Sequence, residues 1–574
     1  GWYTGHFWSL AIEEHFYVIW PSLLAFWGVR RARWGVVVLS LAIAAWRVLE
    51  WAGICHGAND LRGFRVEKRH LQLIRFGWQN SPRRDSKGGV MGTVQQFPVP
   101  GNPTTAPAAA LAGVLRRAVD AQVGPEARFA EREAAALALA NDATRQFLQD
   151  DLVAMVDQQG EPIELDGAGY KRHELGTVRY YTLCGAIDLE RWTYRAMGVH
   201  NGPTVVPLEL EAGLVERTTP ALGSRIMLGY AKDHMRSAAE DMQADHRCPP
   251  SRSTLERVAK AIGTTATRVA PQIERRVRQA ERVPDGAVAI ALGLDRTAVP
   301  MEEDLADGTP PGRRRTTPYL RTPPAPVTVN YRMAYVGTVS FHDADGTELA
   351  TRHYSAAAHE APTDRLVRPM LADVRHALQQ VPTLAVGVVQ DGAPELWRLL
   401  SAAVVAEPLV TRYYEAIDRY HLNERLADLL RELEPDAAAR TAQLSRWNDS
   451  LDRNDHAIYR IRAWVRDQHA AALTDHDRPR LDQIAPHLTY LENNASRMRY
   501  ARLRAVGLPV GSGVTEGACK SVVKMRTNGS GQRWRPTGLT AVLTLRALHQ
   551  SERLPRFWAN FARRYRKEVL PLCA

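Results

Sequence analysis

Two uncharged apolar runs in the second half of the chain have the composition of buried β-strands. They span residues 287–294 and 383–389, and an aspartate follows each of them, Asp295 at once and Asp391 one residue later. An apolar run of about four to eight residues bounded by turn residues is typical of a strand that is covered on both faces. We therefore expect two central strands, each of which ends at an aspartate.

The residues between these runs predict a hairpin and a helix. Two β-rich stretches, 327–342 and 349–355, are separated by Asp345-Gly346, a dipeptide that favours tight hairpin turns. A helical pattern follows over 363–380. This order of strand, hairpin, helix and strand matches the RNase H-like fold, an α/β fold with a mixed five-stranded sheet and flanking helices.

The region before the first of these strands is mostly helical in its pattern. Alanine, leucine, arginine and glutamate recur at helical spacing over 108–158, and 219–243 is helical again. Two short alternating stretches, 177–183 and 190–194, predict strands. We therefore expect a helical region with two short strands ahead of the main sheet.

The helix that begins after Pro250 resembles the second helix of a helix-turn-helix motif. Ser253 is its expected N-cap, and Arg252, Thr254 and Arg257 lie near its start. A recognition helix presents the side chains of its first turns to the major groove, so we expect Arg252 and Arg257 to contact DNA. A purely structural pair of helices explains this weak pattern equally well.

The charge of the chain points to an anionic partner. The formal net charge is +11, and residues 501–574 contain 14 Lys and Arg against 3 Asp and Glu. A basic segment of this kind can bind nucleic acid by neutralising phosphates. A solvated basic tail has the same composition and is the alternative interpretation.

The five cysteines lie far apart, at positions 55, 184, 248, 519 and 573, and none of them forms a Cys-x-x-Cys pair. This spacing argues against a zinc ribbon and against a disulfide framework. It suits a protein of the reducing cytosol, where thiols stay free.

Asp295 and Asp391 would repel each other at neighbouring strand ends unless a cation lay between them. Burial of an unpaired carboxylate is costly, and Mg²⁺ prefers hard oxygen ligands. Two Mg²⁺ ions a few ångströms apart activate the attacking oxygen and stabilise the leaving oxygen in phosphoryl transfer. The pair therefore suggests a two-metal site, although a single aspartate after a strand is more often a turn or cap residue.

Four motifs resemble the ISKra family of bacterial insertion-sequence transposases. They are Asp-Gly-Ala-Pro at 391–394, Asp-Arg-Tyr-His at 418–421, Gly-Leu-Pro-Val-Gly-Ser-Gly-Val-Thr-Glu-Gly-Ala-Cys-Lys at 507–520, and Ser-Gly-Gln-Arg-Trp at 530–534, preceded by Arg526. The resemblance covers roughly residues 100–555, and the block from 507 to 534 is its most specific part.

This resemblance implies a DDE transposase in which Asp295, Asp391 and Glu516 hold two Mg²⁺ ions, for which Mn²⁺ can substitute. Asp285, which precedes the first strand, is the rival for the first position. Asp418 and His421 match the Asp-x-x-His element of the family. His421 would then contact the scissile phosphate or orient the attacking water; the alternative is a histidine packed against a helical insertion.

The residues around Glu516 support a catalytic role on physical grounds. Glu516 follows a Gly-Ser-Gly turn at the start of an expected helix, where the helix dipole favours a carboxylate. Basic and aromatic residues follow that suit a held DNA end. The expected DNA-binding residues here are Lys520, Lys524, Arg526, Arg533 and Trp534.

Residues 1–53 differ in composition from the rest of the chain. The apolar runs 16–29 and 34–46 carry no charge and are separated by three arginines, and tryptophans recur where interfacial anchors are expected. We expect a hydrophobic helical hairpin that contacts a membrane through residues 10–51. Because each run is shorter than the roughly 20 residues of a bilayer span, a buried pair of helices is the alternative.

The same segment resembles part of a membrane enzyme. Residues 8–17, Trp-Ser-Leu-Ala-Ile-Glu-Glu-His-Phe-Tyr, and Trp20-Pro21 are similar to a motif of the integral-membrane acyltransferases that O-acylate polysaccharides. The similarity does not include the span that carries the catalytic histidine of that family. A membrane O-acyltransferase is therefore the alternative function, and we expect this fragment of it to be inactive.

Residues 54–90 are basic, rich in glycine and unlike either neighbour. Ser86-Lys87-Gly88-Gly89-Val90-Met91 could be encoded by a purine-rich AAAGGAGGT stretch that precedes an ATG codon. We therefore expect Met91 to be the natural start of a transposase whose gene entered an acyltransferase gene.

These patterns divide the chain into six segments. They are 1–53 (truncated acyltransferase-like helices), 54–100 (linker), 101–282 (helical DNA-binding region), 283–421 (first part of the core), 422–500 (helical insertion) and 501–574 (end of the core with Glu516 and a basic tail). The expected protein is a cytoplasmic, nucleoid-associated transposase. Its expected partners are double-stranded DNA, as terminal inverted repeats and as target, and further copies of itself. A DNA-binding relic without catalysis is a third interpretation.

Overall fold

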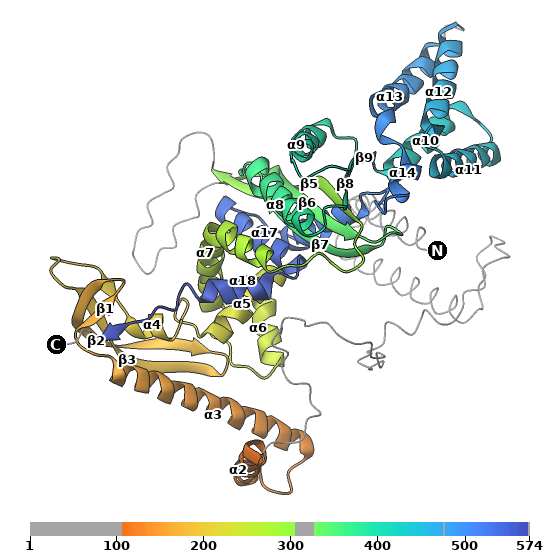
Figure 1. Ribbon diagram of the computed structural model, residues 1–574. Helices are drawn as coiled ribbons and strands as arrows, with labels where there is room; N and C mark the ends of the chain where they lie inside the picture. Colours follow the sequence, from red (N-terminus) through yellow and green to blue (C-terminus); the bar gives the residue numbers. More distant parts are fainter. Residues whose placement is uncertain (1–105, 305–326, 475–476, 572–574) are drawn as a thin grey trace. The chain divides into compact units, whose positions relative to one another are not determined.

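The computed structural model describes residues 106–304, 327–474 and 477–571 (Figure 1). The chain divides into two units, 1–102 and 103–574, and every described residue belongs to the second. The expected membrane hairpin, the acyltransferase-like motif and the junction before Met91 lie outside the described residues. Among the helices of the described ranges, none combines the length and the apolar character needed to cross a bilayer.

The central feature is a mixed five-stranded sheet, as the sequence predicts. Its strands are β5 (Ala289–Asp304), β6 (Val327–His342), β7 (Glu348–Ala356), β8 (Ala385–Gln390) and β9 (Tyr413–Ile417). They lie in the order β7-β6-β5-β8-β9. The first three pair antiparallel, while β8 runs parallel to β5 and β9 parallel to β8.

The patterns of the two apolar runs and of the hairpin are confirmed. Every residue of β8 is buried, which is the reason its sequence shows an unbroken apolar run instead of alternation. β6 and β7 form the predicted hairpin, and Gly346 in its turn has a φ of 78°, a conformation that glycine adopts without steric cost.

The expectation that Asp295 ends its strand is wrong. β5 continues to Asp304, because its antiparallel ladder with β6 runs without a break from Ala289 to Asp304. The pairing of β5 with β8 stops at Leu292. Asp295 therefore lies in mid-strand, just beyond the point where β5 loses its parallel neighbour.

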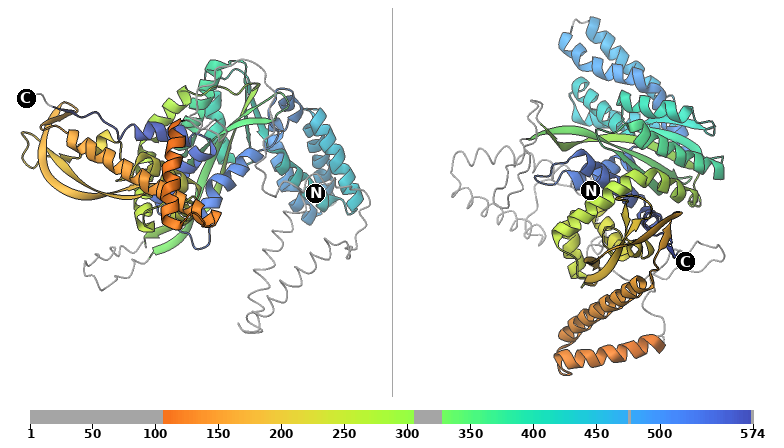
Figure 2. Two further views of the ribbon diagram at one scale, coloured as in Figure 1. Left: turned by 90° about the horizontal axis from the view of Figure 1, so that it is seen from below. Right: turned by 90° about the vertical axis from the view of Figure 1, so that its left-hand side faces the viewer.

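Helices cover both faces of this sheet (Figures 1 and 2). Side chains alternate between the faces of a strand, and contacts assign the faces. Gly337 of β6 lies against Met370 of α8 (Arg368–Gln380), whereas Thr338 hydrogen-bonds Thr515 of α15 (Gly513–Ala518). α8 and α15 therefore lie on opposite faces.

The α8 face carries the larger core of the protein. A single turn of π-helix, η1 (Thr363–Val367), leads into α8, and together they fill the helix predicted at 363–380. α9 (Pro394–Val405) follows β8 and packs on the same core with buried Leu396, Trp397 and Leu400.

The predicted helical insertion follows β9 directly and begins three residues earlier than expected, at Arg419. Asp418 supplies the N-cap, since its carboxylate accepts the amide of His421, and this fixes the first turn of the helix. The helices are α10 (Arg419–Leu433), α11 (Ala437–Arg453), α12 (Ala457–Thr474), α13 (Arg478–Asn494), the 3-10 turn η2 (Ala495–Arg497) and α14 (Tyr500–Arg504).

The α15 face packs on a second core of helices. These are α5 (Pro220–Lys232), α6 (Met235–Ala244), α7 (Arg252–Gln279), η3 (Cys519–Lys524), α17 (Pro536–Gln550) and α18 (Leu554–Ala562). The single turn α16 (Met525–Thr527) follows η3. The single helix expected at 219–243 is two helices, because the chain turns at Asp233 in extended conformation. Ser251, and not Ser253, is the N-cap of α7, since its hydroxyl accepts the amide of Thr254.

The region expected to be mostly helical supplies four strands of a second, five-stranded sheet, and the C-terminal end of the chain supplies the fifth. The strand order of this sheet is β10-β1-β2-β3-β4, and the long helix α3 (Phe129–Gln158) packs on it after α2 (Ala106–Val123). The strands, with the short helix α4 (Pro207–Glu211), are β1 (Ile163–Leu165), β2 (Ala168–Thr182), β3 (Gly185–Ala196), β4 (Thr204–Val205) and β10 (Leu570–Pro571).

The expected strands at 177–183 and 190–194 were too short. The first half of β2, residues 168–176, is exposed or half-buried throughout, so it shows no apolar alternation. Only the half that packs toward the small core, with buried Tyr180 and Thr182, has the pattern of a strand.

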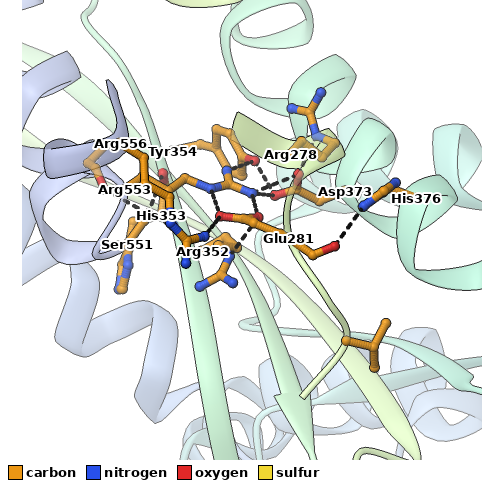
Figure 3. A network of polar contacts seen from close by, with 12 residues as sticks. Arg278, Glu281, Arg352, His353, Tyr354, Asp373, His376, Ser551, Arg553 and Arg556 are labelled. Atoms are coloured by element: carbon orange, nitrogen blue, oxygen red, sulfur yellow. Dashed lines mark hydrogen bonds and ion pairs between the residues drawn. The ribbon is translucent and has the colours of Figure 1, made fainter. Parts of the chain in front are cut away.

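A buried network of charges ties the helices of the second core to the sheet (Figure 3). Arg553 donates to both oxygens of Asp373 at 3.0 Å and to Glu281 at 2.6 Å, and to the Tyr354 hydroxyl at 2.8 Å. Arg278 of α7 also pairs with Asp373. The network joins α7, β7, α8 and the segment between α17 and α18.

Candidate active site

Asp295 and Asp391 each lie three residues beyond the last pair that joins the parallel strands β5 and β8. Leu292 of β5 is paired with Val388 of β8, and each aspartate follows its member of this pair by three residues. Asp391 directly follows the end of β8, whereas β5 continues past Asp295 to Asp304. The parallel register therefore brings the two predicted carboxylates to adjacent positions, although only Asp391 follows the end of a strand.

Burial makes the Asp295 carboxyl group harder to ionise. Loss of water raises the pKa of this carboxyl, and the nearby charges of Asp391 and Glu516 raise the pKa further, against hydrogen bonds from the Arg296 amide and Cys519 that lower it. A carboxylate in this position is stabilised by an added cation. Asp295 thus interacts electrostatically with both of the other predicted carboxylates.

Glu516 reaches the sheet because α15 lies unusually close to it. Alternation along β5 puts Gly293 on the same face as Asp295, and a β-carbon on Gly293 would lie 2.9 Å from the Val389 carbonyl oxygen and even nearer to the Thr515 hydroxyl. Thr515 also makes a hydrogen bond of 2.6 Å to Thr338. Only glycine permits this approach, which sets the position of the adjacent Glu516.

The Glu516 carboxylate is also held by contacts with His421 and Ser512. Glu516 Oε1 lies 3.5 Å from His421 Nε2 and 2.8 Å from Ser512 Oγ. Ser512 Oγ is also 2.8 Å from Asp418 Oδ2, and because a hydroxyl has one proton, it donates to one of the two carboxylates at a time. The Ser512 amide donates to Asp418 as well.

His421 and Glu516 shift each other's titration. The hydrogen bond to Glu516 raises the pKa of His421 to about 9, against the loss of water, with further contributions from Asp418 and Glu424. The same bond lowers the pKa of Glu516. Glu516 stays 46% exposed, so this pair lies at the surface of the site and not in the core.

Among the described residues, Asp418, His421 and Glu516 form a group whose ligand atoms all lie within 4.8 Å of one another. Asp295 and Asp391 do not belong to this group, but Glu516, which does, also acts electrostatically on Asp295. Two aspartates and a glutamate supply hard oxygen donors, which suit Mg²⁺ or Mn²⁺. An imidazole accepts a wider range of divalent ions.

A cleft of about 620 Å³ opens next to Asp391. Its walls come from the loop after β8 and from helices α10 and α13 of the insertion, with the lining residues Asp391, Gly392, Ala393, His421, Glu424, Arg425, Asp428 and Tyr490. Sequence reasoning missed Arg425 and Tyr490, because they belong to no motif and meet only when the insertion folds.

The predicted basic residues after Glu516 differ in their exposure. Lys520, Lys524 and Arg533 are exposed to solvent. Arg526 is 7% exposed and stacks on Trp534, which is 9% exposed and donates its indole N–H to the Thr527 carbonyl at 3.1 Å. Burial argues against the expected DNA contacts of Arg526 and Trp534, which instead fix the loop after η3.

Arg252 and Arg257 lie at the start of α7 and are exposed, as the helix-turn-helix interpretation requires. Each has an acidic neighbour: Arg252 pairs with Glu256 at 2.8 Å and Arg257 with Glu216 at 3.4 Å. The apolar side of α7 is buried in the second core. The apolar side of α7 therefore has a structural role whether or not the helix binds DNA. DNA contact by Arg252 and Arg257 stays a prediction.

Comparison with models of known protein families gives no match for this chain, and comparison with curated proteins gives none either.

Proposed function

We propose that the chain from about residue 91 onward is a DNA transposase of the DDE type, with Asp295, Asp391 and Glu516 as its metal ligands. The observation that carries the proposal is that Asp295 and Asp391 each lie three residues beyond the last pair of β5 with β8, and that the charges of Asp391 and Glu516 both act on Asp295.

The topology of the central sheet supports an RNase H-like core. If the strands are numbered in chain order, their order across the sheet is third, second, first, fourth and fifth. The second strand is antiparallel to both of its neighbours. A helix, α8, lies between the hairpin and the fourth strand. This is the arrangement that the order of strand, hairpin, helix and strand leads one to expect.

The donor set suits a pair of divalent ions. Burial and two neighbouring carboxylates raise the pKa of Asp295, so that the ionised site gains stability from added positive charge. When bound, two such ions supply activation of an attacking oxygen and stabilisation of a leaving one. Asp295, Asp391 and Glu516 would hold them, and Asp418 would act through Ser512 by fixing the turn before α15.

The reaction would proceed in two displacements at phosphorus. In the first, a water molecule loses a proton as its oxygen bonds to the phosphorus at the end of the element, and the bond from phosphorus to the 3′-oxygen breaks, so that this oxygen takes up a proton. In the second, that 3′-hydroxyl attacks a phosphodiester of target DNA, loses its proton, and releases a new 3′-hydroxyl there. His421, beside Glu516 in the cleft wall, would contact the scissile phosphate or orient the water.

The DNA itself would lie along exposed basic residues near the site. Lys520, Lys524 and Arg533 are free to contact phosphates, whereas Arg252 and Arg257 would serve recognition of the terminal repeats. Cleavage of two ends in one event needs more than one copy of the protein, so we propose a homo-oligomer on DNA, acting in the cytoplasm at the nucleoid.

Nicking of supercoiled plasmid tests the proposal. The plasmid carries the DNA that flanks the gene, and the full chain is incubated with it in Mg²⁺ or Mn²⁺ and in chelator. We expect nicks with extendable 3′-hydroxyl ends in either metal and none in chelator. A protein that binds the plasmid but leaves it intact in both metals would be the DNA-binding relic and would contradict the proposed enzyme.

A further inference from the structure

Arg425 is the unpaired cation of the cleft beside Asp391. The cleft's other charged side chains have partners: Glu424 lies 3.4 Å from His421, Asp428 pairs with Arg431, and Asp391 accepts the amide of Ala393 at 3.0 Å. In the part of the chain that the structure describes, Arg425 enters no ion pair and no hydrogen bond, and it is exposed. A guanidinium left in this state is available to a ligand.

Tyr490 holds the guanidinium in place. The Arg425 guanidinium carbon lies 4.6 Å from the centre of the Tyr490 ring, a distance at which a cation is attracted to the face of an aromatic ring. The contact joins α10 to α13 across the cleft wall. It restricts Arg425 without using any of its five N–H donors.

Tyr490 is in turn fixed against the loop that carries Asp391. A β-carbon on Gly392 would lie 2.9 Å from the Tyr490 Cε2 atom, so the glycine allows the ring to press against the backbone next to the carboxylate. The position of Arg425 relative to Asp391 is thus set by two contacts, one between side chains and one with the backbone. Such a chain of packing keeps a binding group at a defined distance from a reacting centre.

We propose that Arg425, supported by Tyr490, binds a DNA backbone phosphate adjacent to the one that is cut. The planar fork of a guanidinium matches two phosphate oxygens, whereas the acidic residues of the cleft exclude nucleic acid unless a cation of this kind offsets them. The inference rests on the proposed function and assigns a task to the helical insertion: it supplies the phosphate clamp next to Asp391. Arg425 contacts substrate, and Tyr490 is its positioning residue.

Salt dependence of DNA binding and the rate of plasmid nicking together test this assignment. The variants of the full chain are Arg425→Ala, Arg425→Lys and Arg446→Ala, the last as a control, because Arg446 is an exposed arginine of α11 that bonds to Gln443 outside the cleft. A lost phosphate contact lowers the slope of log affinity against log salt by roughly 0.9. A purely structural residue would leave that slope unchanged.

For Arg425→Ala we expect a slope reduced by about 0.9 and nicking slowed by roughly tenfold or more. Arg425→Lys should keep the wild-type salt slope, since the positive charge remains. It should still nick DNA more slowly than the wild type, since lysine lacks the planar guanidinium that binds two phosphate oxygens. Arg446→Ala should match the wild type in both. Equal slopes and equal rates for Arg425→Ala and Arg446→Ala would overturn the clamp.

The two proposals fail in different ways. If the wild type nicks DNA and Arg425→Ala does so equally well, the clamp is wrong and the transposase proposal stands. If the wild type never nicks but Arg425→Ala still lowers the salt slope, the cleavage proposal is wrong and the phosphate contact stands.

Discussion

Glu516 and His421 meet across two distant parts of the chain, with Oε1 and Nε2 3.5 Å apart. Glu516 comes from a short helix pressed on β5, and His421 from the first turn of the insertion after β9. The same carboxylate that raises the pKa of Asp295 therefore also raises that of His421. Glu516 is the residue through which the sheet and the insertion share one site.

Divalent ions should stabilise the protein through Asp391. An ion that binds only the folded state at about 100 times its dissociation constant contributes about 2.7 kcal/mol, which appears as a rise of a few degrees in the melting temperature. We expect that rise with Mn²⁺ in the wild type and its loss in Asp391→Asn.

In chelator, Asp391→Asn should melt at or above the wild-type temperature, because it removes a negative charge close to Asp295. Asp285→Asn is the matched control, as Asp285 is exposed and precedes β5. A rise with Mn²⁺ that persists in Asp391→Asn, or that disappears in Asp285→Asn, would count against the metal ligands named above.

Gly293→Ala should damage both stability and activity. The new methyl group would collide with Thr515 and with the Val389 carbonyl, and overpacking of this kind costs about 1–3 kcal/mol. Relief of the collision moves α15, and with it Glu516. Urea unfolding measures the first effect and plasmid nicking the second.

Gly176→Ala serves as the control for Gly293→Ala. Gly176 also lies in a strand, β2, but a β-carbon there would meet no atom within 4 Å. If Gly293→Ala is as stable and as active as Gly176→Ala, then the close approach of α15 to β5 does not exist as described.

Loss of Arg553 should destabilise the second core strongly. Replacement by methionine would remove the partner that Asp373 and Glu281 share and leave them with Arg278 and Arg352, and loss of one partner from a buried ion pair costs up to about 3–5 kcal/mol. Arg179→Ala removes an exposed pair with Asp188 instead, for which about 0–1 kcal/mol is expected. Comparable losses in urea unfolding for the two variants would contradict the role of the network in Figure 3.

His353 should make stability fall with acid. Burial, together with the charge of Arg352, lowers the pKa of His353 to about 4. The unfolded state, with its ordinary pKa of about 6.5, therefore binds a proton that the folded state refuses. Stability contributed by His353 is present above pH 6.5 and is lost as the pH falls from there to about 4.

The expected loss from His353 is at most about 1.4 kcal/mol per pH unit in this window. Unfolding in urea at a series of pH values measures it, with His353→Gln as the comparison. The wild type should lose stability more steeply than the variant between pH 6.5 and 4. Parallel curves for the two proteins would show that His353 is not held neutral by burial.

The central sheet could be predicted because the apolar and alternating patterns in the sequences of its strands reflect which residues are buried. β8 is apolar at every position, and the β6–β7 hairpin has both its alternation and its glycine turn. The end of β5 could not be predicted in the same way. Its second half, from Asp295 to Asp304, mixes charged and apolar residues, and it is a strand only because β6 pairs with it.

The residues of the candidate site also fall into those that could be predicted from the sequence and those that could not. Asp391 and Glu516 lie in local motifs that the sequence shows, a strand end and a turn before a helix, whereas the role of Asp418 as an N-cap appears only in the structure. Arg425 and Tyr490 are 65 positions apart and belong to no motif, so that only the folded insertion brings them together. The burial of Trp534 could not be predicted, because the sequence does not tell a buried aromatic side chain from an exposed one.

The most direct test of the account is the rate of Mn²⁺-dependent plasmid nicking by Asp295→Asn, Asp391→Asn and Glu516→Gln beside the wild type and Asp285→Asn. We predict that each of the three triad variants loses activity by about a hundredfold or more, that Asp285→Asn keeps it, and that all melt within a few degrees of the wild type. Full activity in any one of the three would contradict the triad of Asp295, Asp391 and Glu516.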